Sequence, residues 1–168
     1  ISLKDMMLEV KTGSEAMLNR SNAVLDVILP DPNIHFIGNK TALCGAIQNL
    51  IHNALVAKPL DARIVFSAER DPQKLDCMRL TVTDNGPGIE KDKIQHIFEP
   101  FFTTRSQGTG LGLAVVKTVV QSHQGEVSVS NLVSGGACFS IVLPILTRTG
   151  DEHLSAGATS NNAQQARS

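Results

Sequence analysis

One amphipathic helix constrains the fold of this chain more than any other sequence feature. Between residues 43 and 55, apolar side chains recur every three or four positions, which places them on one face of a helix. Asn39 can cap this helix, and Pro59 ends it. The stripe consists of Leu43, Ala46, Ile47, Leu50, Ile51, Ala54 and Leu55. A helix with a single apolar face has to cover another layer of structure.

Segments with strand patterns supply that layer. Residues 63–69 and 78–84 alternate apolar and polar side chains, and the turn residues 71–74 between them predict a hairpin. Further strands are predicted at residues 23–29, 34–37, 126–130 and 137–143, and further helices at 3–20, 91–97 and 111–122. Gly13 weakens the middle of the first helix. The predicted fold class is α/β: a two-layer sandwich in which helices cover one face of a mixed, mostly antiparallel sheet.

Composition sets the number of domains. The 168 residues are 42% hydrophobic, enough to build the core of a single domain, which we expect to span residues 1–146. Residues 147–168 are mostly Ser, Thr, Asn, Gln, Ala and Gly, and we expect a disordered tail there. The chain starts at Ile1 rather than at methionine, so we expect it to be a piece of a longer protein.

Charge and cysteine content argue against several classes of protein. With 15 basic and 16 acidic residues the net charge is -1, so we expect no nucleic-acid partner. No apolar run approaches the roughly 20 residues of a membrane span, and no secretory signal is visible. Three cysteines without a Cys-x-x-Cys pair do not suggest a disulfide scaffold or zinc site, and they fit a reducing, cytoplasmic location.

Four segments suggest chemistry. In the first, Asn49 and Asn53 lie four residues apart beside the apolar stripe, although asparagine is a poor helix former. An amide oxygen there is a neutral ligand suited to Mg²⁺, but two solvent-exposed asparagines would give the same pattern. The second segment, residues 84–89, places Asp84 after a strand and before two glycines. Its carboxylate suits an exocyclic amine such as that of adenine, although a plain turn is the alternative.

The other two segments are rich in aromatic residues or glycine. Phe98, Phe101 and Phe102 gather in one loop, where they can anchor it or form a satellite hydrophobic cluster. Residues 108–114 place three glycines at the start of a helix, where unpaired N–H groups and the helix dipole favour phosphate. The glycine spacing fits neither a dinucleotide fingerprint nor a Walker A loop.

In their order and amino-acid sequence, these four segments resemble the N, G1, F and G2 boxes of the catalytic domain of sensor histidine kinases. That domain belongs to the ATPase superfamily with the Bergerat fold, which includes gyrase, the Hsp90 chaperones and MutL. The resemblance covers residues 3–144 and includes the closing segment 136–144. The amino-acid sequence of residues 98–105 and 108–113 is most similar to that of the nitrogen-regulation type, including the flagellar regulatory kinases.

The resemblance implies a role for particular residues. Asn53 would coordinate Mg²⁺, Asn49 would support the phosphates or the metal shell, and Asp84 would accept from the adenine amine. Arg105 would reach the γ-phosphate, so the implied catalytic residues are Asn49, Asn53 and Arg105. The implied nucleotide-binding residues are Asn49, Asn53, Asp84, Gly86, Gly88, Ile89, Phe98, Thr104, Arg105, Gly108, Thr109, Gly110, Leu111 and Gly112.

Two positions depart from the family pattern. Ala137 stands where relatives often have Thr, and Thr83 could compensate for the missing hydroxyl. Val56 stands where many relatives have a basic residue, with His52 and Lys58 as candidate replacements.

The resemblance also implies partners. None of the five histidines has the sequence context of a phospho-acceptor; His123 ends a predicted helix, where a cation is favourable. The acceptor histidine would therefore lie on a separate dimerisation domain, and the phosphoryl group would pass on to a response regulator. The full-length protein would be a homodimer and this chain a monomer. The alternatives are a non-catalytic nucleotide-sensing domain and a stand-alone ATPase.

Overall fold

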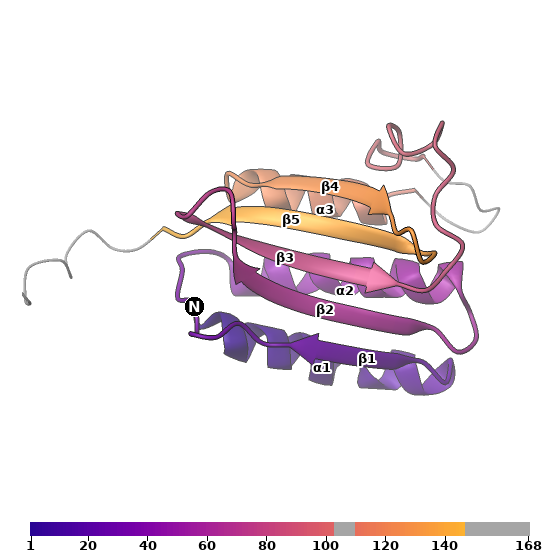
Figure 1. The fold of residues 1–168 in the computed structure, drawn as a ribbon, viewed down its shortest axis with the longest axis horizontal. Coiled ribbons are helices and arrows are strands. Elements are labelled where there is room, and N and C mark those ends of the chain that lie inside the picture. The colour runs from indigo at the N-terminus through magenta and orange to yellow at the C-terminus, as the bar shows by residue number, and fades with distance from the viewer. Residues whose placement is uncertain (103–109, 147–168) are drawn as a thin grey trace, which may run out of the picture.

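The structure, a computed structural model, describes residues 1–102 and 110–146. These residues form three helices and a five-stranded sheet with the strand order β1-β2-β3-β5-β4 (Figure 1). β1 runs parallel to β2, and the other neighbouring pairs are antiparallel. The elements are α1 (Leu3–Arg20), β1 (Val24–Ile28), α2 (Lys40–Ala57), β2 (Arg63–Arg70), β3 (Cys77–Asp84), α3 (Gly112–Ser122), β4 (Glu126–Asn131) and β5 (Ala137–Pro144). The predicted tail, residues 147–168, lies outside the described residues.

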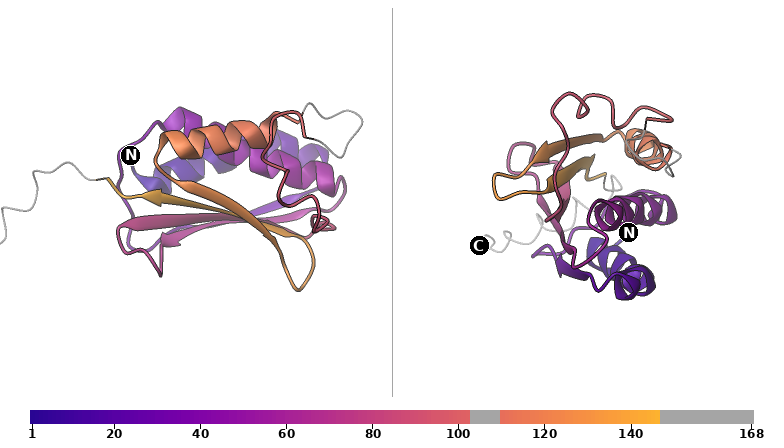
Figure 2. Two further views of the ribbon diagram at one scale, coloured as in Figure 1. Left: turned by 90° about the horizontal axis from the view of Figure 1, so that it is seen from above. Right: turned by 90° about the vertical axis from the view of Figure 1, so that its right-hand side faces the viewer.

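The three helices lie on one face of the sheet and leave the other face uncovered (Figure 2). In β3, Met78, Leu80 and Val82 are buried against the helices, while the side chains between them lie on the uncovered face. Every member of the predicted apolar stripe of α2 is buried as well. Because a large apolar side chain contributes roughly 1.5–3 kcal/mol when buried, this stripe stabilises the packing of α2 in the core. The predicted two-layer α/β fold is confirmed.

The start of α2 is tied to the end of α3. The Asn39 side chain accepts a hydrogen bond from the Ala42 N–H (3.0 Å), which confirms the predicted cap. The Nε2 atom of His123 accepts from the Asn39 backbone N–H (2.9 Å), while its Nδ1 atom lies 2.7 Å from the Val119 carbonyl oxygen. A carbonyl oxygen only accepts, so Nδ1 carries the proton and both bonds require a neutral ring. His123 is thus a bridge between two helices rather than a cation at a helix end.

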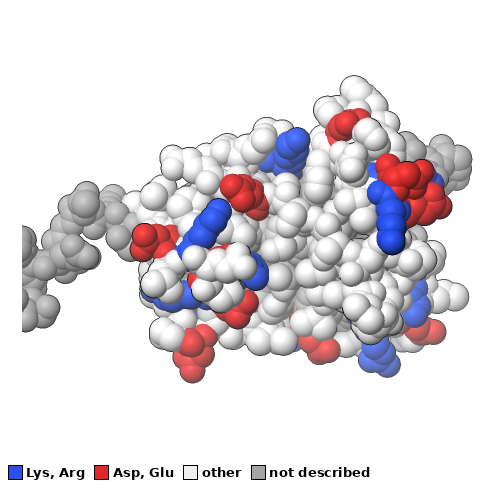
Figure 3. All heavy atoms as spheres, turned by 45° about the horizontal axis from the view of Figure 1, so that its top comes forward, with Lys and Arg blue, Asp and Glu red and all other residues white. Residues whose placement is uncertain are grey.

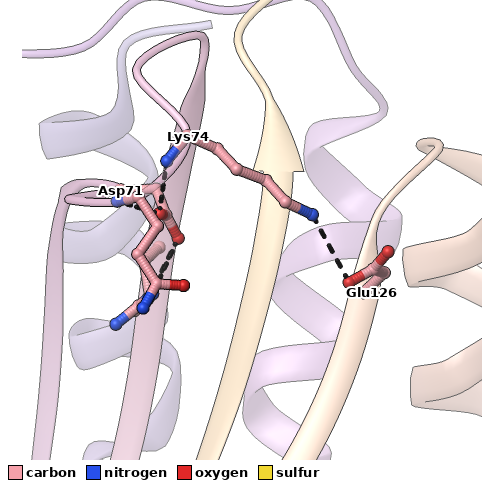
Figure 4. Close-up of polar contacts among 5 residues, drawn as sticks. Asp71, Lys74 and Glu126 are labelled. Atoms are coloured by element: carbon pink, nitrogen blue, oxygen red, sulfur yellow. Dashed lines mark hydrogen bonds and ion pairs between the residues drawn. The ribbon is translucent and has the colours of Figure 1, made fainter.

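The predicted β2–β3 hairpin is confirmed, and a buried carboxylate organises its turn. Asp71 accepts from the backbone N–H groups of Gln73 (2.8 Å) and Lys74 (2.9 Å), and from Arg79 Nε (3.1 Å). Burial by itself raises the pKa of Asp71, but these hydrogen bonds and the Arg79 charge outweigh it, so the pKa lies below its usual value. From the same turn, Lys74 reaches across β5 to Glu126 at 3.7 Å (Figure 4).

Two predicted elements are wrong, and one is stronger than predicted. Residues 34–37 form no strand. Among the described residues their one ladder contact is the bridge between Ser2 and His35, because the segment that contains Ser2 enters α1 at the next residue. Residues 91–97 form successive turns instead of a helix, and Ile97 is the one buried side chain among them, so no apolar stripe holds a helix there. The helix α1, in contrast, is continuous through Gly13.

Candidate functional site

A cavity of about 780 Å³ opens beside α2, within the range of roughly 300–1,000 Å³ typical of ligand pockets. Its walls come from α2, the loop after β3, the start of α3 and the start of β5. It is lined by Asn49, His52, Asn53, Ala54, Val56, Ala57, Asp84, Pro87, Gly88, Ile89, Glu90, Lys93, Ile97, Phe102, Gly110, Gly112, Leu113, Ala137 and Phe139. The structure thus brings predicted site residues from three of the four segments to one place, and the aromatic segment contributes Phe102.

Asp84 is the buried carboxylate of the cavity. As the last residue of β3 it continues the series of inward-facing side chains that begins at Met78. A carboxylate therefore lies at the edge of the apolar core. Its Oδ1 atom accepts from the N–H groups of Gly86 (2.8 Å) and Ala137 (3.3 Å). Within the described residues its Oδ2 atom accepts no hydrogen bond. One oxygen fixes the carboxylate, and the other can accept from a ligand amine.

Close backbone packing positions Asp84. A Cβ atom at Gly136 would lie 1.8 Å from the Asp84 carbonyl oxygen, so no residue with a side chain fits there without moving the strand. Gly86, expected to contact nucleotide, does not line the cavity. Its N–H group instead orients the Asp84 carboxylate, and a Cβ there would come within 2.9 Å of Oδ1.

The missing hydroxyl at Ala137 is not replaced by Thr83. Alternation along β3 places the Thr83 side chain on the uncovered face of the sheet, away from Asp84. The Ala137 backbone N–H still contacts Asp84, so this link to the carboxylate does not depend on the side chain at position 137.

Asn49 and Asn53 line the cavity from α2, on the wall beside the apolar stripe. The Asn53 Nδ2 atom is the one buried side-chain nitrogen or oxygen without a hydrogen-bond partner among the described residues. Its Oδ1 atom is not fully buried and accepts no hydrogen bond from the described residues, so it is open to a ligand.

This donor set fits Mg²⁺. No group of three or more His, Cys, Asp or Glu side chains in residues 1–102 and 110–146 could hold a metal ion. An ion held by Asn53 would therefore take most of its ligands from phosphate and water, as Mg²⁺ commonly does.

The glycines at the start of α3 form part of the cavity wall. Gly110 and Gly112 line it, and no side chain of the described residues caps α3, whose first N–H groups therefore favour an anion. Gly110 has a φ of +71°, and its carbonyl oxygen accepts from the Phe101 N–H at 3.0 Å. Thr104, Arg105, Gly108 and Thr109 lie outside the described residues.

Besides Gly86, two predicted contact residues do not line the cavity. Phe98 packs edge-on against Phe139, with ring centroids 6.2 Å apart, and so supports a side chain that does line it. Leu111 directly precedes α3 without lining the cavity.

Sequence reasoning missed Lys93 and Glu90, which line the cavity as an ion pair of 2.7 Å. The hydrogen bond from Lys93 to Glu90 raises the pKa of the lysine. In the sequence both belong to a run of four charged residues that is typical of a solvent-exposed loop, and charges of both signs are interspersed on the face in Figure 3. Of the candidate cations near the N box, His52 lines the cavity and Lys58 does not.

Comparisons with known proteins identify a family and several similar sequences. Residues 38–147 match the family described as histidine kinase-, DNA gyrase B-, and HSP90-like ATPase. The chain is 37% identical over 131 residues to the sensor histidine kinase ZraS of Salmonella typhimurium, covering 78% of this chain and 26% of that protein. It is 36% identical over 118 residues to the sensor histidine kinase CpxA of Escherichia coli, covering 67% of this chain and 25% of that protein.

The fold has solved counterparts. The catalytic domain of the histidine kinase ThkA superposes with a TM-score of 0.74 at 27% identity, covering 86% of this chain and 93% of that one. This chain spans about a quarter of the length of the two curated relatives. Within the described residues, no helix has the length and apolar character needed to cross a membrane. The chain therefore belongs to the histidine kinase-, DNA gyrase B- and HSP90-like ATPase family, and the curated relatives it matches are sensor histidine kinases.

Proposed function

We propose that this chain is the ATP-binding catalytic domain of a two-component sensor histidine kinase. The observation that carries the proposal is the pairing, across one cavity, of the Asp84 carboxylate with the amides of Asn49 and Asn53. The uncommitted oxygen of Asp84 would accept from the adenine amine, while the two amides face the same cavity from α2. Mg²⁺ held by Asn53 would offset the charge of the triphosphate.

In the proposed reaction the domain holds the donor while another domain supplies the acceptor. An imidazole nitrogen of the acceptor histidine attacks the γ-phosphorus; a nitrogen–phosphorus bond forms as the bond to the β–γ bridging oxygen breaks, and ADP leaves with that electron pair. The start of α3, together with Gly108 and Arg105, would stabilise charge on the triphosphate. The phosphoryl group then passes to a response regulator.

Finer features belong to the same proposal. The amino-acid sequence of residues 98–105 supports a kinase of the nitrogen-regulation or flagellar type, although the curated relatives above are ZraS and CpxA. We further propose a cytoplasmic location, a homodimeric full-length protein and a monomeric isolated chain.

Two measurements test the proposal. Calorimetric titration of the chain should show binding of an ATP analogue that strengthens with Mg²⁺ and exceeds GTP binding. A longer protein that also carries the acceptor helices should transfer the γ-phosphoryl group to a histidine. Fast ATP hydrolysis by the chain alone would favour the stand-alone ATPase, and ATP binding without transfer by the longer protein would favour the nucleotide sensor.

A further inference from the structure

Asn131, the last residue of β4, attaches the loop after β3 to the sheet. Its Oδ1 atom accepts from the Ile89 backbone N–H at 2.8 Å, and its Nδ2 atom donates to the Ile89 carbonyl oxygen at 2.7 Å. One side-chain amide thus satisfies both backbone groups of a residue 42 positions away in the sequence. Asn131 does not line the cavity, whereas Ile89 does.

The loop is shaped to receive this amide. Gly88 has a φ of +78°, a backbone conformation that residues with side chains rarely adopt. A Cβ atom at Gly88 would lie 2.8 Å from Asn131 Oδ1, so a side chain there would collide with the attachment. The glycine both turns the chain and leaves room for the amide.

The β4–β5 hairpin holds the first part of this loop, residues 84–89, at both ends. Asn131 and Ala137 are paired residues in the β4–β5 register. Ala137 donates to Asp84 at the beginning of this part, and Asn131 binds Ile89 at its end. The distance between the carboxylate and Ile89 is therefore set by one pair of opposed residues on the hairpin.

We propose that Asn131 is a positioning residue for the nucleotide base: it fixes Ile89 as a wall of the base pocket opposite the Asp84 carboxylate. The inference rests on the proposed function, since it takes the ligand at Asp84 to be a purine. Because Asn131 acts on the base and not on the phosphates, its loss should weaken ATP and ADP binding by the same factor.

The experiment compares three variants by calorimetry with ATP analogue and ADP. Asn131→Ala removes both hydrogen bonds and should lower the affinity for both nucleotides about tenfold, or roughly 1.4 kcal/mol. Asn131→Asp keeps the acceptor and loses the donor, so its nucleotide affinity should lie between those of wild type and Asn131→Ala. Ser130→Ala is the matched control, because it removes an exposed hydroxyl of the same strand that makes no hydrogen bond with the described residues.

Hydrogen exchange supplies a readout that needs no nucleotide. In Asn131→Ala the Ile89 amide should exchange at least about tenfold faster, while the amides of β2 and β3 keep their wild-type rates. Nucleotide affinity within twofold of wild type in Asn131→Ala, or exchange accelerated equally throughout the sheet, overturns the positioning role. If Asn131→Ala does not fold, Asn131→Asp decides by the same two criteria. Failure of the wild type to bind either nucleotide overturns the proposed function itself, and this inference with it.

Discussion

The imidazole of His123 accepts a hydrogen bond from the backbone N–H of Asn39 and so joins the end of α3 to the beginning of α2. Both helices line the cavity away from this bridge, α2 through Asn49 and Asn53 in its second half and α3 through Gly112 at its start. The bridge therefore fixes, from a distance, the relative placement of the amide wall and the glycine-rich wall.

Replacing His123 should cost stability. His123→Ala leaves the Asn39 N–H and the Val119 carbonyl without this partner, so we expect a loss of about 1–2 kcal/mol in the free energy of unfolding. Urea denaturation measures it. His96→Ala is the control, since His96 contacts only exposed or half-buried neighbours and should change stability by less than about 0.5 kcal/mol. Equal effects of the two substitutions would argue against the bridge.

Asp84→Asn should abolish discrimination for adenine. The amide can keep its oxygen toward the Gly86 and Ala137 N–H groups, but it then presents an NH₂ group where Oδ2 could accept from the amine. We expect ATP affinity to fall at least about 30-fold. The affinity for purine riboside triphosphate, which lacks the amine, should fall far less in this variant. Asp92→Asn, an exposed carboxylate outside the cavity, should bind both as wild type does.

Asn53→Ala should weaken nucleotide binding mainly in the presence of Mg²⁺. The ion would lose an oxygen ligand while the base contacts remain, so we expect a loss of about tenfold with Mg²⁺ and about twofold with EDTA. Thr41→Ala, on the exposed surface of the same helix, controls for helix effects. Equal losses with and without metal would instead assign Asn53 a structural role.

Arg105 is expected to serve the γ-phosphate alone. In a longer protein that carries the acceptor helices, Arg105→Ala should slow phosphotransfer at least about tenfold, because a charge-assisted contact is worth roughly 1.5–3 kcal/mol. ADP affinity should stay near wild type. Arg105→Lys should retain part of the activity, since a point charge serves some phosphate contacts. A wild-type rate in Arg105→Ala, or ADP weakened as much as ATP, contradicts the assignment.

Asp71 should make stability depend on pH in the acid range. Because its pKa is lowered in the folded protein, the ionised carboxylate stabilises the fold above its unfolded pKa. This contribution is lost as the pH falls through the lowered folded value. The gap in unfolding free energy between wild type and Asp71→Asn should therefore be widest near neutral pH and narrow toward acid. Denaturation series at several pH values measure it, and a gap that widens toward acid would have the wrong sign.

Local patterns in the sequence predicted most of the fold. The apolar stripe of α2, the Asn39 cap and the alternation that turns Asp84 inward each depend on residues close in the chain. The predicted strand at residues 34–37 failed because a strand needs a partner of matching length, which sequence periodicity does not supply. The predicted helix at residues 91–97 failed for a different reason: few of those side chains are buried, so nothing holds a helix there.

The candidate site was predicted less completely than the fold. Asn49, Asn53 and Asp84 stand out because each breaks a local rule for its element. Asn131 breaks none: an asparagine at the end of a strand is ordinary, and its partner Ile89 is distant in sequence. Only the register of the sheet brings the two together.

The hydrogen bond between Phe101 and Gly110 has a consequence for how this domain can diversify. Both residues have positive φ angles, +65° and +71°, and together they close the chain on either side of residues 103–109 at a fixed point. Since doubling the length of a closed loop costs only about 0.6 kcal/mol, residues inserted between the two closure points would scarcely affect folding. Evolution can thus lengthen this segment, and an engineer can insert a reporter peptide beside the residues that include Arg105, without disturbing Asp84 or the amides of α2.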